Sequence, residues 1–152
     1  MRESHPIVKS LLLAALCASI LATAARAELN WLTDPKVAQA EAKQANKLVM
    51  LDFTGSDWCG WCIRLKKEVF SKPEFQEYAN KNLVLVEIDF PKGKTQAREL
   101  AQQNMQLASR YSVQGFPTLI VLDANGKKVG ELGYVEGGPT AFIDELEKLR
   151  KG

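Results

Sequence analysis

Two cysteines separated by two residues, Cys59 and Cys62, are the side chains of this sequence best suited to chemistry. They lie in the stretch Trp58-Cys59-Gly60-Trp61-Cys62, which follows an apolar run typical of a buried strand and precedes a predicted helix. A sulfur at a helix N-terminus faces free backbone N–H groups and the positive end of the helix dipole, and both favour the thiolate. Because the second cysteine lies one helical turn deeper, the pair can form and break a disulfide. The spacing therefore predicts thiol–disulfide exchange.

The first 27 residues resemble a signal peptide for export rather than part of the fold. A positively charged start precedes an apolar run from Leu11 to Ala24, and Ala25-Arg26-Ala27 offers small residues at the positions that a signal peptidase reads. An uncleaved membrane anchor is the alternative, but spanning a bilayer takes about 20 apolar residues and this run is shorter. Lipid attachment at Cys17 is disfavoured, because Leu16 is bulky at the position where a typical lipoprotein signal carries a small residue. We therefore expect an exported protein, cleaved near Ala27.

The rest of the chain, residues 28–152, has the size of one domain with a core of its own. It contains equal numbers of basic and acidic side chains, so the net charge of +2 belongs to the predicted signal peptide. This balance does not predict a basic surface for binding nucleic acid. The only histidine, His5, and the third cysteine, Cys17, both precede residue 28. We expect a monomer that has no cofactor, no metal and no nucleic-acid partner.

Three alternatives to a redox role remain for Cys59 and Cys62. A purely structural disulfide is one, but closing so short a ring contributes only about 2 kcal/mol in the loop-entropy model. A zinc site is another, although structural zinc takes four nitrogen or sulfur ligands and residues 28–152 hold no further cysteine and no histidine. Chance spacing is the third. The predicted helix start and the predicted export both favour redox chemistry instead.

The pattern of apolar residues predicts an α/β fold with a central mixed sheet flanked by helices. Buried strands joined by crossover helices imply a parallel part, and the Asn125-Gly126 pair predicts a hairpin that adds an antiparallel edge. The expected elements, in chain order, are a helix from Asp34-Pro35 to about Asn46, a strand over Leu48–Phe53, a helix from near Cys59, a helix start with a capping box at Ser71-Lys72-Pro73-Glu74, a strand over Leu83–Asp89, a helix over Thr95–Tyr111, strands over Thr118–Asp123 and Lys127–Leu132, and a helix from Pro139.

Over essentially all of residues 28–152 the chain resembles the thioredoxin superfamily. The stretch from Leu51 to Cys62 is most similar to small periplasmic disulfide reductases of the DsbH type and to the C-terminal domain of the membrane electron carrier DsbD, and Val69-Phe70-Ser71-Lys72-Pro73 adds to that similarity. The resemblance implies a thioredoxin fold, a periplasmic location, a redox-active Cys59–Cys62 disulfide, protein or peptide disulfides as substrates and a membrane-embedded DsbD-like electron donor. The helical connection over residues 91–112 is longer than in a minimal thioredoxin.

Gly115-Phe116-Pro117-Thr118 resembles the second hallmark of the superfamily, a cis-proline loop packed against the active-site disulfide. On this resemblance we expect a cis bond between Phe116 and Pro117. Such a loop leaves the backbone of Phe116 free to pair with an extended substrate segment, so both residues are candidates for substrate binding. A trans proline that simply begins a strand is the alternative.

Asp52 is a candidate third catalytic residue. Alternation along its strand places it on the same face as Leu48 and Met50, beneath the sheet surface. A buried carboxyl group tends to have a raised pKa and can accept the proton of Cys62 when that cysteine resolves a mixed disulfide. Thioredoxins carry a similar aspartate, although here it is one position further from Cys59. The alternative is an aspartate that only bonds nearby backbone.

Trp58 and Trp61 flank Cys59, and both are candidates for an apolar surface that contacts substrate. Core packing under the helix is the alternative for Trp58, whereas Trp61 lies between the two cysteines on an exposed turn. Arg64, Lys66 and Lys67 are interpreted as a solvated helix face.

The direction of electron flow depends on how strongly the Cys59 thiolate is stabilised. No histidine lies between the cysteines, and the charge of Asp57 opposes the thiolate, so the sequence favours a reductant. An isomerase or oxidase with the same cysteines is the first alternative. A non-catalytic peptide-binding module of the same fold is the second, which the presence of both cysteines disfavours.

Overall fold

The structure is a computed structural model and describes residues 28–152, so the predicted signal peptide lies outside the described residues. The strands are β1 (Trp31–Leu32), β2 (Leu48–Thr54), β3 (Leu83–Asp89), β4 (Thr118–Leu122) and β5 (Lys128–Leu132). The helices are α1 (Pro35–Ala45), α2 (Gly60–Leu65), the π-helical turn η1 (Lys66–Phe70), α3 (Pro73–Asn82), α4 (Arg98–Arg110) and α5 (Gly138–Lys151).

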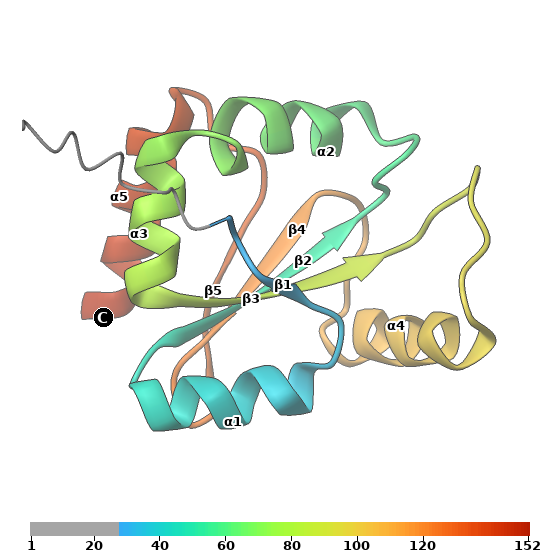
Figure 1. Cartoon of the computed structure of the whole chain (residues 1–152), viewed down its shortest axis with the longest axis horizontal. Coiled ribbons are helices and arrows are strands. Elements are labelled where there is room, and N and C mark those ends of the chain that lie inside the picture. The colour runs from blue at the N-terminus through green and yellow to red at the C-terminus, as the bar shows by residue number, and fades with distance from the viewer. Residues whose placement is uncertain (1–27) are drawn as a thin grey trace, which may run out of the picture.

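The five strands form one mixed sheet in the order β1-β3-β2-β4-β5 (Figure 1). Strands β1 and β2 both run parallel to β3, whereas β4 is antiparallel to β2 and to β5. Every residue of β2 is buried, because this central strand is covered by helices on both faces. Its carboxyl end leads directly into the turn that carries the two cysteines. The predicted mixed sheet is thus present.

Two apolar cores lie on the two faces of the sheet. Helices α2, η1, α3 and α5 cover one face, where Met50, Phe75 and Phe142 are fully buried (Figure 1). Helices α1 and α4 cover the other face, where Phe53 and Leu107 belong to the second core. The side-chain alternation of β2 therefore decides which of its residues face the active-site helix.

Several predicted element boundaries agree with the structure. Asp34 caps α1 by accepting a hydrogen bond from the Lys36 N–H at 2.8 Å, and Pro139 lies in the first turn of α5. The predicted hairpin joins β4 to β5, with Gly126 at a φ of 85°. That left-handed conformation suits glycine, which explains the strength of the Asn-Gly signal.

The helix start predicted at Ser71-Lys72-Pro73-Glu74 is confirmed, because α3 begins at Pro73, but the capping box predicted there is wrong. Helix α3 begins after Lys72, which makes no side-chain capping bond, and Pro73 lies in its first turn. The Ser71 hydroxyl instead donates to the carbonyl oxygen of Lys67 at 2.8 Å. Because Ser71 ends the preceding helix, its hydroxyl satisfies one of the carbonyl groups left open there.

Two further elements differ from the prediction. Strand β1 was not predicted, because two residues are too few to show a period. Helix α4 begins at Arg98 rather than at Thr95, and the side chain of Gln96 in the preceding loop donates to the carbonyl oxygen of Asp89. Within residues 28–152, every helix is too short or too polar to cross a membrane.

Candidate active site

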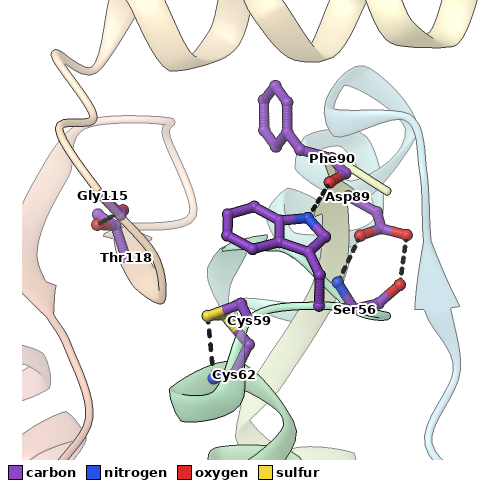
Figure 2. Close-up of a disulfide and its surroundings, with 8 residues drawn as sticks. Ser56, Cys59, Cys62, Asp89, Phe90, Gly115 and Thr118 are labelled. Carbon is purple, nitrogen blue, oxygen red and sulfur yellow. Dashed lines mark hydrogen bonds between the residues drawn. A yellow bond between two sulfur atoms is a disulfide. The ribbon is translucent and has the colours of Figure 1, made fainter. Parts of the chain in front are cut away.

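A disulfide joins Cys59 and Cys62 where the turn after β2 enters α2 (Figure 2). Their Cα atoms are 5.2 Å apart, a separation that a disulfide spans readily. Cys59 is 7% exposed and Cys62 is 5% exposed, so the disulfide is almost entirely buried. The two cysteines singled out from the sequence are brought together as expected.

The start of α2 is aimed at the sulfur of Cys59. Cys59 is the N-cap residue, and its Sγ accepts a hydrogen bond from the Cys62 N–H at 3.2 Å (Figure 2). Because α2 continues directly into η1, helical backbone extends from Gly60 to Phe70. Once the disulfide is reduced, this N–H group and the helix dipole favour the thiolate at Cys59.

Asp52 lies on β2 and lines the same pocket as Cys62. The residue is 7% exposed, and its Oδ1 has no hydrogen-bond partner among residues 28–152. The pKa of Asp52 is raised to about 8, chiefly by burial and also by the charges of Glu87 and Asp89, against the opposing charge of Lys66. The expected burial is confirmed. A carboxyl group with this pKa can exchange protons near neutral pH.

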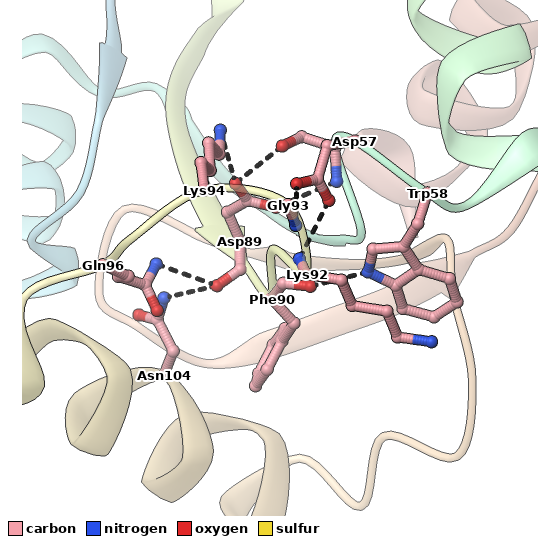
Figure 3. Close-up of polar contacts among 10 residues, drawn as sticks. Asp57, Trp58, Asp89, Phe90, Lys92, Gly93, Lys94, Gln96 and Asn104 are labelled. Carbon is pink, nitrogen blue, oxygen red and sulfur yellow. Dashed lines mark hydrogen bonds and ion pairs between the residues drawn. The ribbon is translucent and has the colours of Figure 1, made fainter.

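Ser56 and Asp57, in the turn before the cysteines, hold the end of β3 and the chain segment that follows it. The Ser56 N–H and hydroxyl donate to the Asp89 carboxylate at 2.9 and 2.7 Å (Figure 2). The Asp57 carboxylate accepts the backbone N–H groups of Lys92 and Gly93 at 3.0 and 2.6 Å (Figure 3). The bond from Lys92 in particular lowers the pKa of Asp57, so this exposed side chain stays ionised two residues before Cys59.

The indole of Trp58 lies over the same segment. Its Nε1 donates to the Phe90 carbonyl oxygen at 2.7 Å, and the Lys92 ammonium lies 3.7 Å from the ring centroid (Figure 3). The residue is still 40% exposed. Trp58 therefore packs against the loop after β3 rather than into the core under α2, and it leaves a face open beside the disulfide.

Trp61 is 54% exposed, as its position between the cysteines predicted. Its ring lies 5.0 Å from that of Tyr134, and the Arg64 guanidinium is within 5.3 Å of both ring centroids. Glu68 completes this group, because it accepts hydrogen bonds from both Arg64 and the Tyr134 hydroxyl. Arg64, interpreted from the sequence as solvated helix face, is thus part of an aromatic and charged cluster.

The loop before β4 carries Phe116 and Pro117, and the peptide bond between them is cis. The Thr118 hydroxyl closes this loop by donating to the Gly115 carbonyl oxygen at 2.7 Å (Figure 2). The Phe116 ring packs edge-on to Trp58 at 6.1 Å between centroids. An aromatic contact therefore connects the cis-proline loop to the turn that carries the disulfide.

Sequence reasoning missed Glu87 and Tyr134. Lys66 is exposed, as predicted for a solvated helix face, and it also lines the pocket that contains Asp52. A signal existed for Glu87, because it is a charged side chain in an otherwise apolar strand; it pairs in register with Asp52 on the neighbouring parallel strand. Tyr134 lies in the loop after β5 and has no comparable local signal. Among residues 28–152, no cluster of three or more histidine, cysteine or acidic side chains could hold a metal ion.

Comparisons with known sequences agree with this geometry. A family model for a thioredoxin-like domain matches residues 35–150. The disulfide bond reductase DsbH of Chlamydia pneumoniae is 37% identical over 127 residues, which cover 84% of this chain and 76% of that protein. The thiol:disulfide interchange protein DsbD of Photorhabdus laumondii is 30% identical over 125 residues, which cover 80% of this chain but only 19% of DsbD.

Solved structures show the same arrangement of elements. A DsbH oxidoreductase superposes with a TM-score of 0.77 at 38% identity, over 82% of this chain and 86% of that one. The oxidised C-terminal domain of DsbD from Neisseria meningitidis gives a TM-score of 0.56 at 21% identity, over 80% of this chain and all of that domain. The second likeness concerns the fold alone. The expected thioredoxin fold and the resemblance to DsbH are confirmed.

Proposed function

Since the chain belongs to the thioredoxin-like family and is a thiol–disulfide oxidoreductase with a Cys59–Cys62 pair, we propose that it reduces protein disulfides in the periplasm. The observation that carries this proposal is the Cys59 sulfur at the start of α2, within hydrogen-bond distance of the Cys62 N–H. A reactive thiolate and a second sulfur one turn away are what the reaction needs.

In the proposed reaction, the Cys59 thiolate attacks a substrate disulfide, forms a mixed disulfide and releases the first substrate sulfur as a thiolate. Cys62 then gives its proton to Asp52 and attacks the Cys59 sulfur. The Cys59–Cys62 disulfide forms, and the second substrate sulfur leaves. Two electrons pass from the cysteine pair to the substrate.

The reducing direction is supported by the charges around Cys59. The ionised carboxylate of Asp57 opposes a negative charge on the Cys59 sulfur, and a less stable thiolate makes the pair more reducing. Residues 28–152 contain no histidine that would stabilise the thiolate. The relative with 37% identity is itself named a disulfide bond reductase.

The location and the electron donor belong to the same proposal. Residues 1–27 have the pattern of an export signal, and the periplasm is kept oxidising, so a reductase there needs a source of electrons. A membrane-embedded donor of the DsbD type would re-reduce the pair, and the protein would act as a monomer. Similarity to part of DsbD supports this choice of donor.

The substrate surface is proposed to consist of the exposed faces of Trp58 and Trp61 with the Phe116–Pro117 loop. The two indoles are 40% and 54% exposed on either side of Cys59, and large aromatic side chains contribute strongly to recognition. An extended polypeptide segment lying along this surface would present its disulfide to Cys59.

A turbidity assay of insulin reduction tests the exchange reaction. The wild-type protein should speed precipitation well beyond the dithiol reductant alone, and Cys59→Ser should remove this effect. Cys62→Ser should accumulate mixed disulfides, because the resolving sulfur is missing. A protein that only binds peptides would give the rate of the reductant alone, and that result would contradict the proposal.

The equilibrium potential against glutathione buffers tests the direction. We expect a value clearly below the roughly −180 mV of protein disulfide isomerase. A value near that of the strong oxidant DsbA, about −120 mV, would overturn the reductase assignment and favour an oxidase.

A further inference from the structure

The loop that follows β3 carries a lysine whose ammonium group lies beside the redox pair. Lys92 is exposed, and its Nζ is 3.7 Å from the ring centroid of Trp58, the residue that precedes Cys59 (Figure 3). The face of an indole ring attracts a positive charge placed over it. An ammonium group has three hydrogen-bond donors, and contact with one ring face leaves donors open. Lys92 can therefore still bind a further group at this position.

The place of Lys92 is fixed by its surroundings. Its backbone N–H and that of Gly93 donate to the Asp57 carboxylate at 3.0 and 2.6 Å. Trp58 is held against the same loop by its hydrogen bond to the Phe90 carbonyl oxygen at 2.7 Å. Both partners of the cation–π contact are thus anchored near the disulfide before a substrate arrives. Such preorganisation lowers the entropic cost of binding.

Lys92 has no acidic partner among the residues that the structure describes, because its Nζ is absent from every ion pair found there. Two acidic groups lie nearby, and the carboxylate of each is already occupied. Asp57 accepts the two backbone N–H groups of the loop, and Asp89 accepts hydrogen bonds from Ser56 and an ion pair from Lys94. The Lys92 side chain extends along the indole, away from the Asp57 carboxylate (Figure 3). It therefore presents a positive charge that the folded chain leaves unpaired.

The cation on the other side of Cys59 differs in this respect. Arg64 lies over the ring of Trp61, but it forms an ion pair with Glu68 at 2.8 Å, and the charge of Glu136 also acts on it. The Trp61 side of the disulfide is thus compensated in charge. A carboxylate on a substrate is attracted chiefly to the Trp58 side, where Lys92 is not neutralised.

The unpaired cation also lies on the side of the cis-proline loop. Phe116 packs edge-on to Trp58 at 6.1 Å between ring centroids, and it stacks on Phe90 of the lysine-bearing loop at 5.0 Å. A polypeptide that lies along the Phe116–Pro117 loop therefore passes close to the ring on which the Lys92 ammonium rests.

We propose that Lys92 is a specificity-determining residue, which selects protein and peptide disulfides that carry a carboxylate next to the substrate cysteine. The inference rests on the proposed function, because it names the class of substrate that the Trp58 surface favours. An aspartate or glutamate beside the substrate cysteine accepts a hydrogen bond from the Lys92 ammonium while the substrate sulfur approaches Cys59. A charge-assisted bond of this kind is stronger than one between neutral groups. Lys92 acts on binding alone, and no proton or electron passes through it.

Three synthetic peptides that differ only in charge test the proposal. Each is a dimer of a capped pentapeptide, joined by one disulfide at a central cysteine that is flanked on both sides by glutamate, glutamine or lysine. The rate constant for reduction by the reduced protein is measured by acid quench and chromatography of the released peptide. Division by the rate constant with 2-mercaptoethanol removes the intrinsic effect of the charges on the disulfide.

The wild type should reduce the glutamate peptide about 3- to 5-fold faster than the glutamine peptide at low salt, and the lysine peptide more slowly than either. High salt should remove most of this preference, because ions screen an exposed pair. Lys92→Gln should abolish the preference, Lys92→Glu should reverse it and Lys92→Arg should retain it. The rate with the glutamine peptide should change little in these variants.

Lys43→Gln is the matched control. Lys43 is an exposed lysine in the last turn of α1, which precedes the start of β2, whereas the cysteines follow the end of that strand. The control removes the same charge far from the disulfide, so it should keep the preference of the wild type. A preference lost equally in both glutamine variants would show an effect of net charge and overturn the assignment to Lys92.

The glutamine peptide separates failure of this inference from failure of the proposed function. Equal rates with all three peptides, or a preference that survives Lys92→Gln, would overturn the inference while rapid reduction of the glutamine peptide still supported exchange through Cys59. If the wild type reduced even the glutamine peptide no faster than an ordinary free thiol does, the proposed function itself would be contradicted.

Discussion

Asp52 illustrates how a single residue can be placed for chemistry at the expense of stability. Its carboxyl group is buried beneath the disulfide, and Oδ1 has no partner within residues 28–152. Desolvation disfavours the charged form, so the folded state prefers the protonated acid up to a pKa of about 8. In the unfolded chain the same group ionises near its ordinary value of 3.8. The folded protein should therefore lose stability as the pH rises between these two values.

Asp52→Asn tests this linkage. Between pH 4 and pH 8 the wild type should lose unfolding free energy steadily as the pH rises, because the folded state holds more of this proton than the unfolded state. The neutral asparagine removes that loss. In urea denaturation of the oxidised proteins, the unfolding free energy of the variant should therefore rise relative to that of the wild type as the pH increases from 5 to 8. Parallel stability curves for the two proteins would show that Asp52 ionises normally in the fold.

Trp61→Ala tests the second residue beside the nucleophile. The exposed indole is proposed to contact polypeptide, so its loss should raise the KM for a protein disulfide by about 5- to 30-fold, the range of one strong interface contact. The rate with a small aromatic disulfide should change little, since that substrate does not reach the indole. Met105→Ala, which removes a side chain that is 67% exposed on α4, serves as the control. An equal loss of activity with both substrates would show instead that Trp61 acts by packing on Tyr134 and not by contacting polypeptide.

At the scale of elements, the turn before α2 and the loop after β3 form one unit. Ser56 binds Asp89 at the end of β3, and Asp57 and Trp58 bind the loop that follows. The aromatic ring of Phe90 in the loop stacks on Phe116 at 5.0 Å, which adds the cis-proline loop to the same unit. The lengthened connection over residues 91–112 therefore supports the position of the disulfide turn.

Gly55→Ala tests this unit. A Cβ atom at residue 55 would come within 2.5 Å of the Trp58 indole, which must then move and weaken its hydrogen bond to Phe90. We expect a loss of about 1–3 kcal/mol in unfolding free energy, as for other overpacked sites, and a change in tryptophan fluorescence. Gly60→Ala is the matched control, because its Cβ would meet nothing within 4 Å. A Gly55→Ala variant with the stability of the control would mean that the indole is free to shift.

The same elements show what local sequence patterns can and cannot predict. The apolar runs of β2 and β3 and the Asn-Gly hairpin were predicted, because the burial of a strand and the conformation of a turn depend on residues that are adjacent in the sequence. The capping box at Ser71 was not correct, since a serine can bond either the helix before it or the helix after it. The contacts from Asp57 to Gly93 and from Trp61 to Tyr134 join distant segments, and only the fold brings those side chains together.

At the scale of the whole molecule, one aromatic group joins the active-site helix to the end of the chain. The ring centroid of Phe142 on α5 lies 5.8 Å from the ring centroids of Phe70 and Phe75, and Phe142 is fully buried. Phe70 ends the helical segment that begins at Gly60, directly after Cys59. The position of the redox pair thus depends on a core built from three helical segments and the sheet.

Phe142→Ala should therefore lower the unfolding free energy by about 3–5 kcal/mol, through lost burial and the cavity that remains. Denaturant unfolding with circular dichroism measures this loss, and the whole fold should unfold in one transition. Val37→Ala, at a side chain that is 53% exposed on α1, should change stability by no more than about 0.5 kcal/mol. Separate unfolding of α5 ahead of the sheet would show that the two are not one cooperative unit.

The most direct measurement is the pH dependence of alkylation at Cys59 in the reduced protein, with iodoacetamide as the probe and mass spectrometry to locate the label. The helix start predicts that Cys59 reacts faster at pH 7 than Cys62 or a free cysteine, with an apparent pKa below the usual value of about 8.5. Cys59→Ser should then abolish turnover. An apparent pKa at or above that of a free thiol, together with turnover that survives Cys59→Ser, would contradict the assignment of this sulfur as the nucleophile.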